Sequence, residues 1–221
     1  MQKVNKPPLD IDEFREIVHR ESARLRLRSR THSDNSEEAF TLALALSVAV
    51  KKIFYAKSKL RFSNEPVLEK KLIIKYDDKM RVDAMQKFND ATVFSAVEFA
   101  LTEQALKRQQ YIMTLVLFLS KEFLADFLYL LQYPYIDFDD DLELQDGCGT
   151  LVNLIAGQYR KEMGALKYKD FAMSHFDSYI NSAPGGLVIP KGATHKYEIS
   201  FEFEKIKRLV VEVVISPKMR K

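Results

Sequence analysis

The chain has 221 residues and a mass of 25.6 kDa, long enough for one sizeable core with an appendage. Apolar residues make up 47% and charged residues 29%, which excludes a largely disordered chain. The net charge of +3 is too small to indicate nucleic-acid binding, and one cysteine with four histidines excludes an internal disulfide and supplies no zinc ligand set.

The first 35 residues are predicted to form a helical extension, because apolar residues recur at near-helical spacing from Leu9 to Leu25. Between Arg20 and Arg30, five arginines have Glu21 as their only nearby counter-charge. Such a stretch can contact an acidic protein, a lipid or nucleic acid, or it can be a solvated helix end. The helix end is favoured over nucleic acid or membrane contact, because no aromatic residue is interleaved for base stacking. No signal-peptide core precedes the first charges, so a cytoplasmic protein is expected.

Polar caps and hydrophobic periodicity predict the elements of the first half of the main domain. The polar cluster Ser33–Ser36 is expected to cap a helix, and Ser120 another. The charged link Glu103–Gln110 suits a hairpin or a short helix. The predicted elements are a helix over Ala39–Ala56, strands over Thr92–Phe99 and Tyr111–Phe118, and a helix over Lys121–Gln132.

The second half alternates loop signals with longer periodic runs. The acidic loop Asp137–Asp141 leads into a helix expected over Leu142–Met163, and Pro184–Gly186 and Pro190–Gly192 interrupt a β-rich tail. Strands are predicted over Tyr197–Phe203 and Leu209–Ile215. The order of elements predicts an α+β fold, in which helices cover one face of a largely antiparallel sheet.

The segment from Asp146 to Gly157 carries the candidate chemistry. As a helix it places two sets of side chains on different sides. The packing side has Leu144, Cys148, Leu151 and Ile155, and the side that can face a partner has Asp146, Thr150, Asn153 and Gly157. Gly147 and Gly149 each cost about 1 kcal/mol relative to alanine in a helix, which predicts the close approach of another backbone there.

This segment resembles the motif helix of the CheX/CheC/FliY chemotaxis phosphatases, Asp-x-x-Gly-Glu-x-x-Asn-x-x-Ala-Gly. The matching residues are Asp146, Gly149, Asn153, Ala156 and Gly157. The flanks also resemble the family: a strand before a Ser-capped helix, a Pro-containing loop over Asp177–Gly192, and a closing hairpin from Lys196 to Ile215. The resemblance implies a CheX-like domain over residues 36–221, with an antiparallel-rich sheet and long helices on one face.

In such proteins the Glu-x-x-Asn pair enters the active site of phosphorylated CheY, a response regulator with an acyl phosphate on aspartate. The resemblance implies that Asn153 orients the attacking water, that Thr150 occupies the second catalytic position, and that Asp146, Gly149 and Gly157 contact the partner. It implies no cofactor of the chain's own, since Mg²⁺ belongs to the regulator, and no small-molecule substrate. A homodimer joined through sheet edges is also implied.

Thr150 departs from the family pattern, because the expected residue is glutamate. A hydroxyl cannot make the charge-assisted contact to the regulator's lysine, which is worth roughly 1.5–3 kcal/mol. Asp146, one turn earlier, is a shorter substitute, and the earlier helical segment Glu37–Ala56 has no Glu-x-x-Asn pair, so a second active centre is not expected. Two hypotheses follow: a phosphatase with weakened activity, or a catalytically inactive interaction protein of the chemotaxis or flagellar switch machinery.

Other polar residues are assigned ordinary roles. His175 and His195 have no nucleophile pattern nearby and are expected to be surface histidines. The Asp137–Asp141 loop lacks the glycine and distal glutamate of an EF-hand loop, so a solvated loop is expected rather than a calcium site.

Overall fold

A computed structural model describes residues 34–58, 62, 65–82, 84–133, 136–203, 206–217 and 219. The helix predicted over Leu9–Leu25 and the stretch from Arg20 to Arg30 lie outside the described residues. Helix α2 begins at Asp34, two residues before the domain boundary predicted from the sequence. The division into an extension and a domain stays a prediction.

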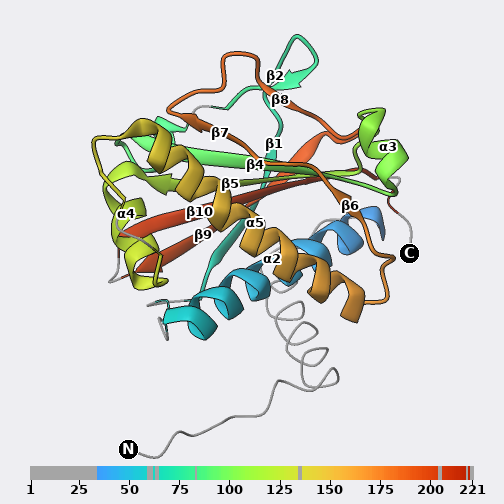
Figure 1. Ribbon diagram of the computed structural model, residues 1–221. Helices are drawn as coiled ribbons and strands as arrows, with labels where there is room; N and C mark the ends of the chain where they lie inside the picture. The colour runs from blue at the N-terminus through green and yellow to red at the C-terminus, as the bar shows by residue number, and fades with distance from the viewer. Residues whose placement is uncertain are drawn as a thin grey trace, which may run out of the picture.

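Helices are interspersed with paired β-strands along the described part of the chain (Figure 1). The helical elements are α2 (Asp34–Ser58), η1 (Met85–Lys87), α3 (Glu103–Lys107), α4 (Lys121–Leu130) and α5 (Asp141–Ala165). The longer strands are β1 (Val67–Leu72), β4 (Thr92–Ala100), β5 (Met113–Ser120), β9 (His195–Phe203) and β10 (Ile206–Ile215). The short strands are β2 (Lys75–Tyr76), β3 (Lys79–Met80), β6 (Ala172–Met173), β7 (Asp177–Ile180) and β8 (Leu187–Val188).

The main sheet has the strand order β1-β9-β10-β5-β4-β6, with β7 also paired to β4. The described strands of this sheet all pair in the antiparallel sense, including those of the predicted β9–β10 hairpin. A smaller antiparallel sheet has the order β2-β3-β8. The predicted α+β class with an antiparallel-rich sheet is confirmed.

Helices α2, α4 and α5 cover one face of the main sheet, and α2 and α5 run side by side there (Figure 1). Side chains alternate along a strand, so one set from each strand faces the helices. On β4, Val93, Val97 and Phe99 join the core beneath α2 and α5. This is the predicted layer of long helices on one face.

The opposite face of the sheet is covered as well. Phe94 and Ala96 of β4 point there and pack with Met80 of the small sheet and Leu187 of β8. Because both faces are buried, β4 and β5 are buried along their whole length. This explains their near-continuous apolar sequences, which are typical of strands without a solvated face.

Several elements match the expectations from local sequence. The Ser120 hydroxyl accepts a hydrogen bond from the Phe123 N–H and caps α4, as predicted. The Glu103–Gln110 link contains the short helix α3, capped by Thr102, so the helical alternative is the observed one.

By length and composition alone, Glu38–Ala56 of α2 could cross a membrane, with a mean hydropathy of 1.6. Half of this window is buried in the protein. Leu42, Leu46 and Phe54 are fully buried in the core beneath α2 and α5. The apolar character of α2 is accounted for by its packing against α5 and the sheet.

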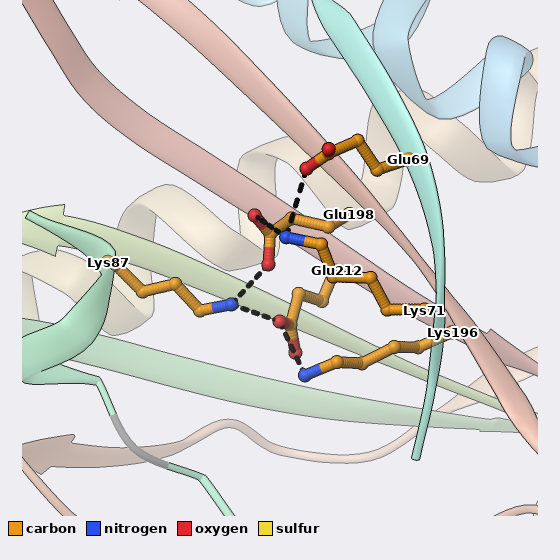
Figure 2. A network of polar contacts seen from close by, with 6 residues as sticks. All are labelled: Glu69, Lys71, Lys87, Lys196, Glu198 and Glu212. Atoms are coloured by element: carbon orange, nitrogen blue, oxygen red, sulfur yellow. Dashed lines mark hydrogen bonds and ion pairs between the residues drawn. The ribbon is translucent and has the colours of Figure 1, made fainter.

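A network of charged side chains lies on the sheet face opposite α2 and α5 (Figure 2). Glu212 on β10 is fully buried and Glu198 on β9 nearly so. Figure 2 shows Lys87 of η1 reaching between these two carboxylates, and it forms an ion pair with each. Lys196 lies 2.6 Å from Glu212. Lys71 on β1 lies 2.9 Å from Glu198.

The lysines of this network decide the protonation state of Glu198. Burial by itself would raise the pKa of Glu198, but hydrogen bonds and charge from Lys87 and Lys71 lower this pKa to about 2. Burial acts to lower the pKa of Lys87, and the carboxylates of Glu212 and Glu198 raise it overall. Glu198 and Lys87 are therefore held as a pair of opposite charges at neutral pH.

Candidate functional site

Helix α5 carries the candidate motif and begins with a strong N-terminal cap. The Asp140 carboxylate accepts hydrogen bonds from the N–H groups of Leu142 and Glu143, at 2.9 and 3.1 Å. Asp141 and Glu143 add negative charge to the first turn, where the helix dipole favours it. The helix predicted over Leu142–Met163 is confirmed, and it extends from Asp141 to Ala165.

The inner side of α5 is the predicted packing stripe. Leu144, Cys148, Leu151 and Ile155 are all fully buried in the core between α5 and the sheet. Burial raises the pKa of the Cys148 thiol to about 12, so this cysteine is a packing residue rather than a nucleophile.

The residues predicted to face a partner lie on the opposite side of α5. Asp146 is exposed, and Thr150, Asn153 and Gly157 are half-buried. They follow one another at three- and four-residue steps, so they share the outward face of a helix that lies on the outside of the sheet (Figure 1). The amide of Asn153 is thus not sealed beneath the sheet.

Asn153 has an unusual hydrogen-bonding state within this face. Its Oδ1 atom is buried and has no hydrogen-bond partner among the described residues. A buried acceptor without a partner costs roughly 1–3 kcal/mol, and such groups in proteins often have a functional reason. Oδ1 is therefore not used by an internal hydrogen bond, and it has to become exposed before it can accept a hydrogen bond from water or a partner.

The two glycines early in α5 make room for side chains, not for another backbone as predicted. A Cβ atom at Gly147 would lie 2.5 Å from Leu128 and 2.7 Å from Ile136. At Gly149 it would lie 2.1 Å from the ring of Phe176. Gly149 is buried, so its place in the motif has an internal explanation, and the predicted partner contact rests on Asp146 and Gly157.

Gly157 differs from these glycines. A Cβ atom there would meet nothing within 4 Å, and the same is true of Gly164 two turns later. Within the described residues no steric reason for glycine exists at either position. The absence of a side chain at Gly157 would let a partner surface approach the helix backbone closely.

The position of α5 is fixed by polar contacts as well as by the core. The carboxylate of Glu162 is buried and accepts hydrogen bonds from Lys52 of α2 at 2.9 and 3.0 Å. Arg160 makes a bidentate pair with Asp170 just after the helix. These contacts hold the motif face in a defined orientation relative to α2 and the sheet.

No protein-family model matches the sequence, and a search of curated proteins finds no match. Solved structures do match. FliY of Thermotoga maritima is 14% identical, with a TM-score of 0.54 over 84% of this chain and 91% of that chain. A CheC-like superfamily protein from Shewanella sp. PV-4 is 12% identical, with a TM-score of 0.51 over 78% of this chain and 96% of that chain. The chain has the CheC-like fold. A chemotaxis protein CheX from Desulfovibrio desulfuricans also shares it, with 12% identity and a TM-score of 0.51 over 79% of this chain and 99% of that chain.

Within this CheC-like fold, the acidic loop before α5 serves the local structure. Asp140 caps the helix, and Asp137 accepts a hydrogen bond from the Asp139 N–H at 2.9 Å. In the part of the chain that the structure describes, no three His, Cys, Asp or Glu side chains are grouped as metal ligands would be. The loop has a structural role that its sequence alone did not reveal.

Two further places in the CheC-like fold lie away from the motif face. A cavity of about 170 Å³ lies between the start of α2 and β9, and Lys70, His195 and Tyr197 are among its lining residues. His175 is exposed on the link between β6 and β7. Neither feature adds a residue to the outward face of α5.

Phe176 is the site residue that sequence reasoning missed. It lies just before β7, and its half-buried ring packs against α5 at Gly149. The two residues are far apart in the sequence, so no local pattern predicts the contact. The sequence signal for this contact was Gly149 itself, because a glycine inside a helix indicates that another group packs closely there.

Proposed function

We propose that this chain is a chemotaxis protein of the CheX/CheC/FliY type that binds a phosphorylated CheY-type response regulator in the cytoplasm. The outward face of α5 is the contact surface, and the chain hydrolyses the regulator's aspartyl phosphate with weakened activity. The observation that carries the proposal is the amide of Asn153. It lies on the outward face between Asp146 and Gly157, and its Oδ1 has no partner among the described residues.

The reaction needs no nucleophile from this chain. The oxygen of water forms a bond to phosphorus while the bond from phosphorus to the aspartate oxygen breaks, giving inorganic phosphate and a free carboxylate. A carboxamide can both donate and accept hydrogen bonds, so Asn153 can hold the water in line with the breaking bond. The Mg²⁺ that neutralises phosphate charge would be the regulator's.

Thr150 is the reason for expecting weakened activity. A glutamate at this position would pair with the regulator's lysine, and its loss removes roughly 1.5–3 kcal/mol of charge-assisted contact. Asp146 is the exposed carboxylate one turn earlier on the same face. Its shorter side chain can replace only part of that contact.

The proposal is tested by acyl-phosphate loss from a CheY-type regulator phosphorylated with acetyl phosphate. We expect the wild-type chain to accelerate the loss, and Asn153→Ala to reduce that acceleration about tenfold, corresponding to about 1.4 kcal/mol of lost positioning. Thr150→Glu should increase the rate, because it restores the carboxylate. Equal rates with the wild type and Asn153→Ala would remove the catalytic part of the proposal.

Thr150 also favours a second candidate function, a catalytically silent interaction protein of the chemotaxis or flagellar switch machinery. In that case the chain binds the regulator in a pull-down, and neither the wild type nor Asn153→Ala changes the rate of dephosphorylation. Absence of binding to both the phosphorylated and the unphosphorylated regulator would argue against both candidates.

Gly157 provides a separate test of the contact surface. We expect Gly157→Ala and Gly164→Ala each to raise the free energy of unfolding by about 0.5–1 kcal/mol, because alanine is the better helix former and its Cβ has space. Only Gly157→Ala should weaken regulator binding, because its methyl group lies on the proposed contact surface. Urea unfolding and binding titrations check the two effects, and equal affinities of the two variants would contradict the assignment.

The resemblance to this family also leads us to propose a homodimer joined through sheet edges. Strand β1 is an edge strand of the main sheet, paired only with β9 among the described strands. Sedimentation of the full chain at several concentrations tests this assembly. A monomer at all concentrations would contradict it.

A further inference from the structure

The ring of Phe176 lies across α5 one turn before Asn153. Three of its ring atoms, Cε2, Cδ2 and Cζ, would lie 2.1–2.5 Å from a Cβ atom at Gly149. Gly149 and Asn153 are four residues apart in the helix, so they are neighbours on its surface, with side chains about 5–6 Å apart. The ring therefore covers the helix surface at Gly149, the position next to Asn153 on the preceding turn.

We propose that Phe176 is a positioning residue for Asn153, an inference that rests on the proposed function. An amide that orients water must be held in place while its polar atoms are not used by internal hydrogen bonds. Asn153 is not held through its Oδ1, which has no hydrogen-bond partner among the described residues. Packing against an aromatic ring restricts the side chain without using its polar atoms.

Phe176 is itself held firmly from both sides. Ser174, two residues earlier, donates to the buried carboxylate of Glu98 at 2.8 Å and accepts from the Glu98 N–H at 2.9 Å. Two residues later, the Ser178 hydroxyl lies 2.6 Å from that of Ser95. Both anchors are on β4, a central strand, so the ring is fixed to the rigid part of the fold.

The placement of the ring predicts a change in turnover rather than in affinity. We expect Phe176→Ala to lower kcat for dephosphorylation of the acetyl phosphate-treated regulator about tenfold and to leave KM within about twofold, because misplacement of a catalytic group mainly affects the chemical step. Phe176→Leu, which retains a bulky apolar side chain, should recover most of the rate.

Phe40 supplies a matched control. It is also a half-buried phenylalanine packed against the core beneath α2 and α5, where its ring meets Tyr197 edge-on at 6.2 Å. Phe40→Ala should lower the melting temperature to a similar degree and leave kcat unchanged when both variants are assayed well below their melting temperatures. A merely structural role for Phe176 would give the same kcat for both alanine variants, and that result would overturn the inference.

A second variant covers the case in which Phe176→Ala does not fold. Gly149→Ala displaces the ring from the helix side, because the new Cβ and the ring cannot occupy the same space. The same fall in kcat is expected, and an unchanged kcat would overturn the inference.

If Asn153→Ala had no effect on the rate, the proposed function itself would fail. A strong effect of Asn153→Ala with wild-type kcat in the Phe176 and Gly149 variants would contradict the positioning role alone.

Discussion

Replacing Lys87 with methionine should lower the free energy of unfolding by about 3–5 kcal/mol, the cost of removing one partner from a buried ion pair. Lys87 is paired with both Glu198 and Glu212, whose side chains are 5% and 0% exposed. Methionine retains the apolar stem but leaves these carboxylates with less compensating charge in a site that excludes water. Urea unfolding at pH 7 gives the difference directly.

The control for this variant is an ion pair at the surface. Lys51 pairs with Glu65, and both side chains are well exposed. Lys51→Met should cost less than about 1 kcal/mol, because exposed pairs are solvated and screened. Adding Glu198→Gln to Lys87→Met should restore part of the lost stability, since one buried negative charge is then removed. A loss no larger for Lys87→Met than for Lys51→Met would show that the buried network contributes little.

Acid should destabilise the protein in a defined range of pH. The pKa of Glu198 falls from 4.5 to about 2 in the folded state, because the hydrogen bonds from Lys87 and Lys71 outweigh burial. A carboxyl group whose pKa is lower in the folded state stabilises the fold at pH values above its unfolded pKa. This stabilisation is lost as the pH falls toward the folded pKa. We therefore expect up to about 3 kcal/mol of stability to disappear between roughly pH 5 and pH 2.

The measurement is the free energy of unfolding as a function of pH, in the wild type and in Glu198→Gln. The variant should be less stable at pH 7, and its stability should fall less steeply with acid. Lys87 should also cause a loss of stability at alkaline pH. Its pKa is raised in the folded state, so its charge stabilises the fold at neutral pH, and this stabilisation disappears as the pH rises through the folded pKa of Lys87. Parallel acid slopes in wild type and variant would contradict the assignment to Glu198.

The elements that sequence predicted well are those with a strong local pattern. Ser120 is a cap residue that indicates the start of α4. In α2 and α5, apolar residues recur at helical spacing over a length that is typical of a helix and not of a loop. Strands β4 and β5 are apolar along their length because both faces are buried. In each case the residues that determine the element lie within it.

The parts that were missed depend on distant partners. Strands β2, β3, β6 and β8 have two residues each, too few for any periodicity. Strand β1 alternates in burial over its first four residues, but half of its six residues are charged, and this gave no strand signal. Glu198 and Glu212 occupy positions that look solvent-facing in an alternating strand, and only the covering of the second sheet face makes them buried.

The candidate site divides in the same way. The sides of α5 occupied by Cys148 and Asn153 follow from helical spacing and were predicted. The role of Gly149 was not, because its neighbour Phe176 comes from a link 27 residues later in the chain. Contacts of this kind arise from how β6 and β7 pair with β4, a feature of the assembled sheet.

The burial of Cys148 makes this residue a built-in probe of local opening of the protein. The sequence has a single thiol, and it is fully buried with its pKa raised to about 12. Because the thiol is fully buried and only the thiolate reacts, an alkylating reagent modifies it when α5 separates from the sheet. The rate of alkylation therefore reports excursions of the motif helix, without any label being introduced.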